Sequence, residues 1–243
     1  MQINLHQLCK KFGNKTAVDI SDFTINNGDI IGLVGNNGAG KTTLFRLILD
    51  LLKADSGIVT MVTADGQNSI NPAQSEEWKL ISGAYIDEGF LIDFLTPEEY
   101  FDFTARINGL PAIDWEDIDN SIIAPFIPFT NGEIFNQKKL IRDFSAGNKQ
   151  KIGIISALFT KPELVILDEP FNFLDPTGQN TLKQIISQYA QSTGATVLIS
   201  SHNLQHTTDI STRIALLEHG SIIEDLPNIN GSANQALEEY FKV

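Results

Sequence analysis

The sequence contains little cysteine and little positive charge. Its one cysteine, Cys9, excludes a disulfide within the chain and with it the disulfide-rich domains of secreted proteins. Lys and Arg number 17 against 30 Asp and Glu, which gives a formal net charge of −13 at pH 7. Binding to nucleic-acid phosphates or to anionic lipid requires clustered basic residues. The charge balance therefore argues against both kinds of partner.

Long hydrophobic runs are also lacking. The purest apolar stretch, residues 152–159, is far shorter than the roughly 20 residues that cross a bilayer as a helix. The first six residues show neither the basic nor the apolar region of a signal peptide. We therefore expect no direct membrane span and a place in the reducing cytoplasm. With 243 residues and 42% hydrophobic content, the chain can form one large folded domain, which excludes disordered and low-complexity classes.

Turn residues divide the start of the chain into three predicted strands, at 2–8, 17–25 and 30–34. The third is a continuous apolar run, which is typical of a strand buried on both faces in a parallel sheet. Leucine and isoleucine residues at helical spacing then predict a helix over residues 41–52.

The rest of the chain resumes an alternation of strands and helices after a middle of different character. The middle is dense in Phe, Pro and acidic residues, and we expect a helical subdomain over about 88–160, inserted in a single domain of residues 1–243. After the middle we predict three apolar strands, at 164–167, 196–200 and 213–217. A hairpin turn at 219–220 and a closing helix at 233–241 follow them. This alternation predicts an α/β fold.

A phosphate-binding loop directly follows the third strand, where residues 35–42 match G-x-x-x-x-G-K-[ST]. Glycines let the backbone curl so that successive N–H groups point at phosphate oxygens, aided by the positive end of the next helix. Lys41 supplies a charge, Thr42 a hydroxyl ligand for Mg²⁺ and Thr43 a donor to the α-phosphate. We expect these residues to bind a nucleotide: Gly35, Asn36, Asn37, Gly38, Ala39, Gly40, Lys41, Thr42 and Thr43.

Two carboxylates follow a later apolar strand. Asp168 at the strand's end is the expected Mg²⁺ ligand, usually through water, and Glu169 is the candidate general base for an attacking water. His202 follows another buried strand that reaches the same sheet edge, where it can contact the γ-phosphate. The phosphate loop alone is compatible with GTPases, kinases and other ATPases, whereas the carboxylate pair favours hydrolysis.

The order of these motifs resembles that of the nucleotide-binding domain of ABC transporters over essentially the whole chain. Residues 35–43 resemble its Walker A motif, 164–169 its Walker B motif and 173–176 its D-loop, and His202 resembles its switch histidine. Residues 144–148, Phe-Ser-Ala-Gly-Asn, lie where the family's Leu-Ser-Gly-Gly-Gln signature is found. The resemblance implies a P-loop NTPase core with a mixed sheet, N-terminal antiparallel strands and a helical insertion.

A dimer that binds ATP and Mg²⁺ between two subunits is a further implication of the resemblance. Two such domains pair head to tail, so that each MgATP lies between Walker A of one and the signature of the other. Ser145, Gly147 and Asp175 are the contacts that this chain would provide. A serine hydroxyl and backbone amides at a helix N-terminus form an anion site, which fits this role. The second ATPase subunit is either a copy of this chain or a relative.

Two further positions follow from the family pattern. Phe12 matches the aromatic residue that stacks on adenine. Asp87 stands where the family has a glutamine after a short strand, and as a catalytic and metal-binding residue it would reach Mg²⁺ or the attacking water through a water molecule. Glu88 is the alternative if the alignment shifts by one residue. The chain departs from the family pattern at three other positions: Ala146, Asn148 and Phe173.

The function implied by the resemblance is that of the ATP-hydrolysing motor subunit of a multi-chain, exporter-type ABC transporter. A separate transmembrane permease would then dock against the insertion near residues 87–100, and this subunit would lie in the cytoplasm, peripheral on the inner face of the membrane. The alternative is a soluble ABC-type ATPase that acts as an assembly or regulatory factor. An ABC ATPase acting on nucleic acid is disfavoured by the net charge, and the chain lacks the Asn-Lys-x-Asp motif of GTPases.

Overall fold

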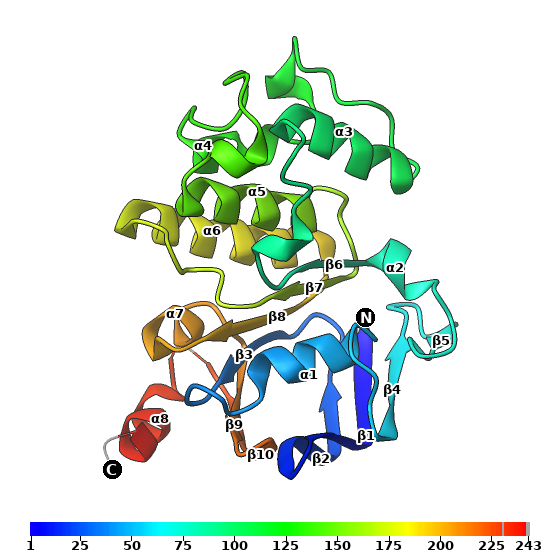
Figure 1. The fold of residues 1–243 in the computed structure, drawn as a ribbon. Coiled ribbons are helices and arrows are strands. Elements are labelled where there is room, and N and C mark those ends of the chain that lie inside the picture. Colours follow the sequence, from blue (N-terminus) through cyan, green and yellow to red (C-terminus); the bar gives the residue numbers. More distant parts are fainter. Residues whose placement is uncertain (230, 242–243) are drawn as a thin grey trace.

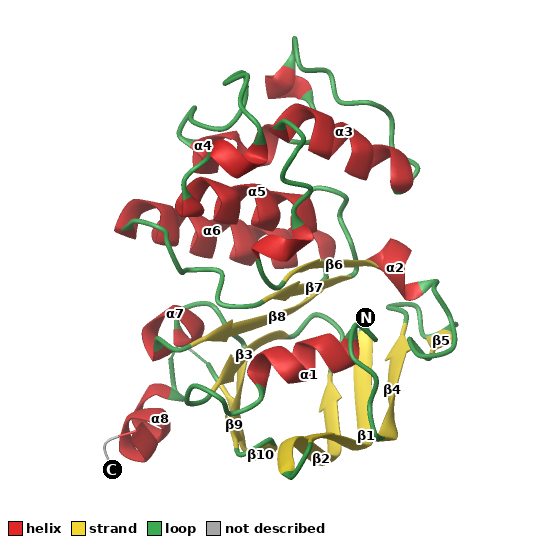
Figure 2. Cartoon of the chain, viewed as in Figure 1, coloured by secondary structure: helices red, strands yellow, loops and turns green. Residues whose placement is uncertain are grey.

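Two β-sheets and the helices packed against them make up the fold, in a computed structural model that describes residues 1–229 and 231–241 except for the side chain of Glu88. One sheet has the strand order β2-β1-β4-β5, and the other has the order β10-β9-β3-β8-β7-β6 (Figure 1). Figure 2 shows a helical layer above the second sheet and α1 (Lys41–Ile48) below it, beside the first sheet. The predicted α/β class, with a mixed sheet and N-terminal antiparallel strands, is confirmed.

The first sheet is antiparallel. Its first two strands form a hairpin whose register joins Phe12 to Lys15 across a two-residue turn, in which Gly13 has a left-handed φ of +57°. The strands therefore extend beyond the predicted 2–8 and 17–25, and β4 and β5 were not predicted at all. The bounds are β1 (Gln2–Phe12), β2 (Lys15–Ile25), β4 (Ser56–Val62) and β5 (Ser69–Ile70).

The second sheet is parallel except at one edge, where β10 pairs antiparallel with β9. All residues of β3, β7 and β8 are buried, as predicted for apolar strands covered on both faces. The predicted strands and the hairpin turn before β10 are confirmed. The bounds are β3 (Ile30–Val34), β6 (Ser82–Tyr85), β7 (Leu164–Leu167), β8 (Thr196–Ser201), β9 (Arg213–Glu218) and β10 (Ser221–Pro227).

Alternate side chains of the buried strands serve two cores. In β7, Val165 and Leu167 belong to a core shared with the helical layer, whereas Leu164 and Ile166 belong to a core shared with α1 and β1. Successive side chains of a strand point to opposite faces of a sheet. The central sheet is therefore held between the helical layer on one face and α1 with the antiparallel sheet on the other.

The helices lie mostly in the middle and last thirds of the chain. Between residues 88 and 160 the described structure contains α-helices and short 3₁₀ turns and no strand. Within the described residues, no helix has both the length and the apolar character needed to cross a membrane. The α-helices are α1 (Lys41–Ile48), α2 (Trp78–Ile81), α3 (Pro97–Ile107), α4 (Ile127–Thr130), α5 (Ala146–Leu158), α6 (Pro176–Thr193), α7 (Leu204–Thr208) and α8 (Asn234–Phe241). The 3₁₀ turns are η1 (Glu88–Phe90), η2 (Ile118–Asn120), η3 (Ala124–Phe126) and η4 (Ile141–Asp143).

Helix α1 ends four residues before the predicted end at residue 52. Asp50 adopts a left-handed φ of +47°, and its N–H donates to the Leu47 carbonyl at 3.2 Å. The N–H of Leu51 donates to the Arg46 carbonyl at 2.9 Å. This pair of bonds is a Schellman motif, which satisfies the last carbonyls of the helix and stops it. The apolar spacing of the following leucines continues past the stop, which is why the spacing overestimated the helix.

Helix α5 lies very close to β6. A Cβ atom on Gly153 of α5 would lie 2.1 Å from the Tyr85 ring, and one on Gly83 of β6 would lie 1.9 Å from the Ala157 carbonyl oxygen. Side-chain atoms at either glycine position are therefore incompatible with the observed spacing. These two glycines fix the height of α5 above the sheet and hence the position of the segment before it.

We predict that Gly153→Ala destabilises the fold even though it improves helix propensity. Alanine favours a helix interior by about 1 kcal/mol over glycine, but overpacking typically costs about 1–3 kcal/mol, so we expect a net loss of about 1 kcal/mol, the middle of the resulting range. Urea unfolding measures the difference, with Gln184→Ala on the exposed face of α6 as the control. Equal or greater stability of Gly153→Ala would contradict the close packing.

Candidate functional site

The phosphate loop, residues 35–42, follows β3, includes the first two residues of α1 and packs tightly on neighbouring backbone. A Cβ atom on Gly35 would lie 2.2 Å from the Leu217 carbonyl oxygen, and one on Gly40 would lie 2.3 Å from the Ala17 carbonyl oxygen. Gly40 also has a left-handed φ of +113°. Only glycine fits these two places, which explains the spacing of the motif physically.

Lys41 is buried at the first turn of α1. Its Nζ donates to the Gly35 carbonyl oxygen at 2.8 Å, so the lysine closes the loop on itself, and it lies 3.8 Å from Oε1 of Glu169. A cleft of about 350 Å³ opens beside the loop, with Phe12, Lys15 and Glu169 on its walls. The cleft therefore places the charge of Lys41 and the amides of the loop beside the exposed ring of Phe12.

Asp168 follows β7 and is buried beside the start of α1. Its two carboxylate oxygens accept hydrogen bonds from the hydroxyls of Thr42 and Ser200. Burial is the largest influence on this carboxyl and raises its pKa above the ordinary value. The Glu169 carboxylate also raises this pKa, whereas the two hydroxyl bonds and the charge of Lys41 lower it. An oxygen pair of this kind, one hydroxyl and one carboxylate, matches what Mg²⁺ prefers in proteins.

Glu169 is held in a left-handed conformation, with a φ of +48°. Two hydrogen bonds fix this uncommon backbone: its N–H donates to Ser200 Oγ at 2.8 Å, and Gln150 Nε2 donates to its carbonyl at 3.1 Å. A third holds the side chain, because the N–H of His202 donates to Oε2 of Glu169 at 3.2 Å. The same Oε2 lies 2.8 Å from Nδ1 of His202. Strained backbone of this kind persists where the surroundings over-determine it, and it clusters at functional sites.

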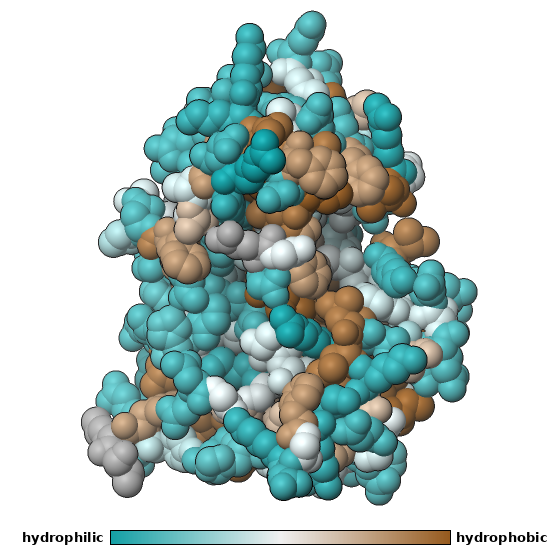
Figure 3. All heavy atoms as spheres, viewed as in Figure 1, coloured by the Kyte–Doolittle hydropathy of each residue, from teal (hydrophilic) through white to brown (hydrophobic). Residues whose placement is uncertain are grey.

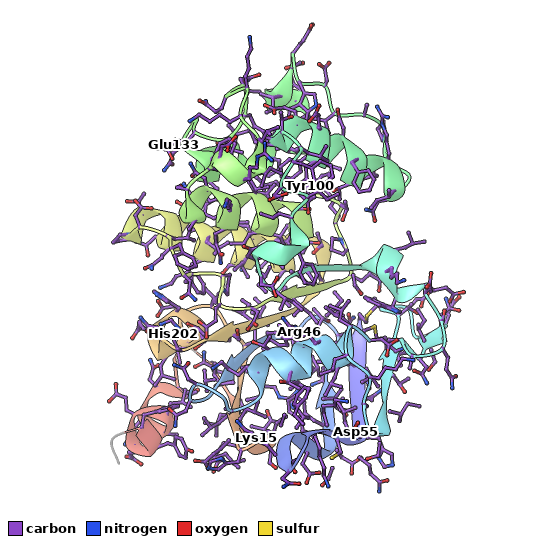
Figure 4. All side chains as sticks on the ribbon, viewed as in Figure 1. Lys15, Arg46, Asp55, Tyr100, Glu133 and His202 are labelled. Atoms are coloured by element: carbon purple, nitrogen blue, oxygen red, sulfur yellow. The ribbon has the colours of Figure 1, made fainter. Side chains whose placement is uncertain are left out.

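His202, labelled in Figure 4, follows β8, and its side chain is 59% exposed. The sequence-predicted residues Lys41, Thr42, Asp168, Glu169 and His202 therefore form one connected cluster at the edge of the sheet. Such a cluster can hold a phosphate chain beside a carboxylate base. Parallel strands ending at a common edge bring these residues together although they lie far apart in the sequence.

Other predicted residues lie elsewhere. Ser145 is the N-cap of α5 and accepts a hydrogen bond from the Asn148 N–H at 3.3 Å. Asp175 is the N-cap of α6 and accepts from the Gly178 N–H at 3.0 Å. Neither lines the cleft beside the phosphate loop. A Cβ atom on Gly147 would lie 2.7 Å from the Phe173 carbonyl oxygen, so the start of α5 packs against the segment before α6.

Phe12 and Asp87 flank the cluster without joining it. Phe12 lies on the wall of the cleft with 52% of its surface exposed, and Lys10 Nζ lies 5.6 Å from the centre of its ring. Asp87 forms an ion pair with Arg46 on α1, at 2.9 Å between Oδ2 and Nη2, and no hydrogen bond between described side chains joins it to Thr42 or Asp168. The Glu88 side chain, the alternative to Asp87, lies outside the described residues.

Comparison with known proteins decides the family. The model of the ABC transporter family matches residues 18–172. The bacitracin transport ATP-binding protein BcrA of Bacillus licheniformis is 33% identical over 93% of this chain and 69% of its own length. The protein of the same name from Enterococcus faecalis is 30% identical over 92% of this chain and 68% of its own length.

The chain belongs to the ABC transporter family. Both relatives named above are transport ATP-binding proteins, and this chain is an ATPase of the family. A solved structure titled as the ATP-binding subunit of an ABC transporter matches it with a TM-score of 0.82 at 23% identity, over 100% of this chain and 98% of that one. A dimeric ATP-binding cassette bound to ADP and Pi matches with a TM-score of 0.79 at 20% identity, over 94% and 99%. These two likenesses concern the fold.

Two residues of this ABC subunit's site were not predicted from the sequence. Ser200 bridges Asp168 and the N–H of Glu169, and Gln150 supports the Glu169 carbonyl from α5. Ser200 carried a weak signal, since a serine inside an otherwise apolar strand needs a buried hydrogen-bond partner. Gln150 carried none, because its partner lies 19 residues away along the chain.

We predict that Asp168→Asn raises the free energy of unfolding at pH 7 in the absence of nucleotide. Because burial raises the folded-state pKa, the ionised carboxylate destabilises the fold above that pKa, and this effect fades as pH falls through it. The neutral amide removes the effect, and the two hydroxyls can accept as well as donate. Thermal unfolding between pH 4 and 8 measures this, with the exposed Asp93→Asn as the control. A less stable variant at pH 7 would show that the ionised Asp168 carboxylate does not destabilise the fold.

Proposed function

We propose that this chain hydrolyses MgATP to drive transport through a separate transmembrane permease of an exporter-type ABC transporter. The observation that carries the proposal is the connected cluster of Thr42, Asp168, Glu169 and His202 beside the phosphate loop. A carboxylate within reach of the phosphate site supports hydrolysis rather than nucleotide binding alone.

The phosphate loop would bind the nucleotide through its amides and Lys41. On this proposal, the loop residues already named (Gly35, Asn36, Asn37, Gly38, Ala39, Gly40) and Thr43 contact the phosphates, and Phe12 stacks on the adenine base from the wall of the cleft. Lys41 exchanges its bond to the Gly35 carbonyl for phosphate oxygens. Thr42 and Asp168 would hold Mg²⁺, which when bound neutralises charge that develops on the phosphates.

Glu169 is the proposed general base. Its carboxylate is fixed by His202 on one side and faces Lys41 on the other, so it points along the edge where the phosphates would lie. Through its ring nitrogen, His202 orients this carboxylate, and its exposed ring is free to meet the γ-phosphate. The strained backbone of Glu169 keeps the carboxylate in one orientation before the substrate arrives.

Ser145, Gly147 and Asp175 would serve the site of a second ATPase subunit. All three lie outside this chain's own cleft, and α5 presents its capped N-terminus at Ser145. Helix N-termini bind anions such as a phosphate group. A head-to-tail dimer, either of two copies of this chain or of this chain with a relative, would therefore complete each site.

The membrane partner would dock beside the helical subdomain of about 88–160. Large hydrophobic side chains are exposed on α2, on α3 and between them, and Figure 3 shows brown surface gathered over this region. They are Leu80, Phe90, Phe94, Phe103 and Ile107. Exposed apolar patches of this kind mark protein–protein contacts. The subunit would then be cytoplasmic and peripheral on the inner face of the membrane.

Bacitracin transport is the activity named for BcrA; for this chain the cargo would be selected by the permease.

We predict that Glu169→Gln retains MgATP binding but loses turnover by about 10²–10⁴-fold, because the amide cannot accept the proton of the attacking water. The trapped MgATP should also accumulate an ATP-dependent dimer. Phosphate release and calorimetric ATP binding measure the two effects, and light scattering detects the dimer.

The exposed Glu224→Gln is the matched control and should behave like the wild type. Undiminished turnover in Glu169→Gln would refute the general-base assignment. An unaltered ATP affinity in Lys41→Ala would refute the phosphate site itself. A protein that binds no membrane partner yet hydrolyses ATP would favour the alternative, a soluble assembly or regulatory factor.

A further inference from the structure

An ion pair joins α1 to the turn that leaves the central sheet. Arg46 lies one helical turn after Thr42, and its Nη2 lies 2.9 Å from Oδ2 of Asp87. The other oxygen of Asp87 accepts the Gly89 N–H at 2.8 Å, so the same carboxylate also caps the turn η1. The two side chains are 44% and 49% exposed, and exposed ion pairs contribute little to stability. The location of the Arg46–Asp87 pair between α1 and η1, rather than its strength, suggests a role.

A buried tyrosine continues the connection from η1 into the helical layer. The carbonyl of Phe90, the last residue of η1, accepts the hydroxyl of Tyr100 on α3 at 3.4 Å. The same hydroxyl accepts a hydrogen bond from Ser156 Oγ of α5 at 3.2 Å. Burial raises the pKa of Tyr100, which keeps the hydroxyl protonated and able to donate. Figure 4 shows Arg46 on α1 and Tyr100 in the helical layer above it.

These contacts form one path from the phosphate loop to the helix that begins after Ser145. It runs from α1 through Arg46 and Asp87 to η1, and from η1 through Tyr100 to α5. The central sheet supports the middle of this path. Tyr85 lies two residues before Asp87, and its carbonyl accepts a hydrogen bond from the Asp168 N–H at 2.9 Å.

We infer that Arg46, Asp87 and Tyr100 are positioning residues for ATP hydrolysis, which hold α5 in register with α1. This rests on the proposed function, since α5 carries the proposed phosphate contact Ser145. In this role Asp87 acts through Arg46 rather than as a ligand of Mg²⁺. Weakening the path leaves nucleotide affinity intact and lowers the rate at which the aligned state forms.

The first test is a double-mutant cycle on the full chain. Arg46→Ala removes the ion pair, and Asp87→Asn removes the charge but keeps an oxygen for the Gly89 N–H. Each should lower kcat about three- to fivefold and leave the KM for MgATP within about twofold of wild type. The double variant should be no slower than either single variant, because one interaction is removed. Arg46→Lys, which keeps the charge, should restore most of kcat.

The second test concerns Tyr100. Tyr100→Phe should lower kcat alone but have no further effect in the Arg46→Ala background. Tyr189→Phe is the matched control, because Tyr189 is also buried and donates from its hydroxyl to the Pro162 carbonyl at 2.8 Å, away from the path. It should lower the melting temperature without changing kcat. Lys79→Ala, which breaks the exposed Lys79–Glu76 pair at 3.0 Å, is the control for the ion pair.

The outcomes distinguish failure of the positioning role from failure of the proposed function. Additive losses in the cycle, no rescue by Arg46→Lys, or equal losses of kcat in the controls would overturn the positioning role while leaving ATP hydrolysis established. Absence of MgATP turnover in the folded wild type would overturn the proposed function and this inference with it. A raised KM with unchanged kcat would assign Arg46 and Asp87 to nucleotide binding and so also overturn the inference.

Discussion

The buried carboxylate of Asp168 is the group on which the rest of the site depends. It stands at the end of β7 and accepts hydrogen bonds from the start of α1 and from β8, through Thr42 and Ser200. A buried carboxylate is costly unless its oxygens are hydrogen-bonded. The two hydroxyls reduce that cost. They also join α1, β7 and β8, although Thr42 lies more than 100 residues before Asp168 and Ser200 in the sequence. The phosphate loop is thereby held against the strand that precedes Glu169.

Packing constraints surround this carboxylate on both faces of the sheet. Glycines allow the phosphate loop to rest on the Ala17 and Leu217 carbonyls, and allow α5 to approach β6 to within contact of Tyr85. Glu169 is then fixed in a left-handed conformation by the hydrogen bond that its N–H donates to Ser200 and by the one that its carbonyl accepts from Gln150 of α5. The reactive geometry is therefore a consequence of close backbone packing, and the local strain at Glu169 is balanced by bonds from two neighbouring elements.

Local signals predicted the parts of this structure that are contiguous in the sequence. The strands β3 and β7 have the predicted bounds, because a short apolar run between turn residues is typical of a buried strand and is too short for a helix. The phosphate loop was also predictable, because the eight residues of its motif are consecutive in the sequence. The strands β4 and β5 were missed because their alternation is interrupted by Gly57 and polar residues, and α1 was overextended past the left-handed Asp50. Partners distant in sequence, such as Arg46 for Asp87, left no local trace.

We propose that Thr42 and Asp168 together hold Mg²⁺ beside the ATP-binding loop, and the Mg²⁺ dependence of ATP affinity tests this proposal. Calorimetry on wild type and Asp168→Asn, each with and without Mg²⁺, compares the four affinities. If these two residues hold the ion, Mg²⁺ strengthens ATP binding by at least about tenfold in the wild type and has little effect in the variant, whose affinity without Mg²⁺ equals that of wild type. A variant that keeps the full Mg²⁺ effect would contradict this proposal.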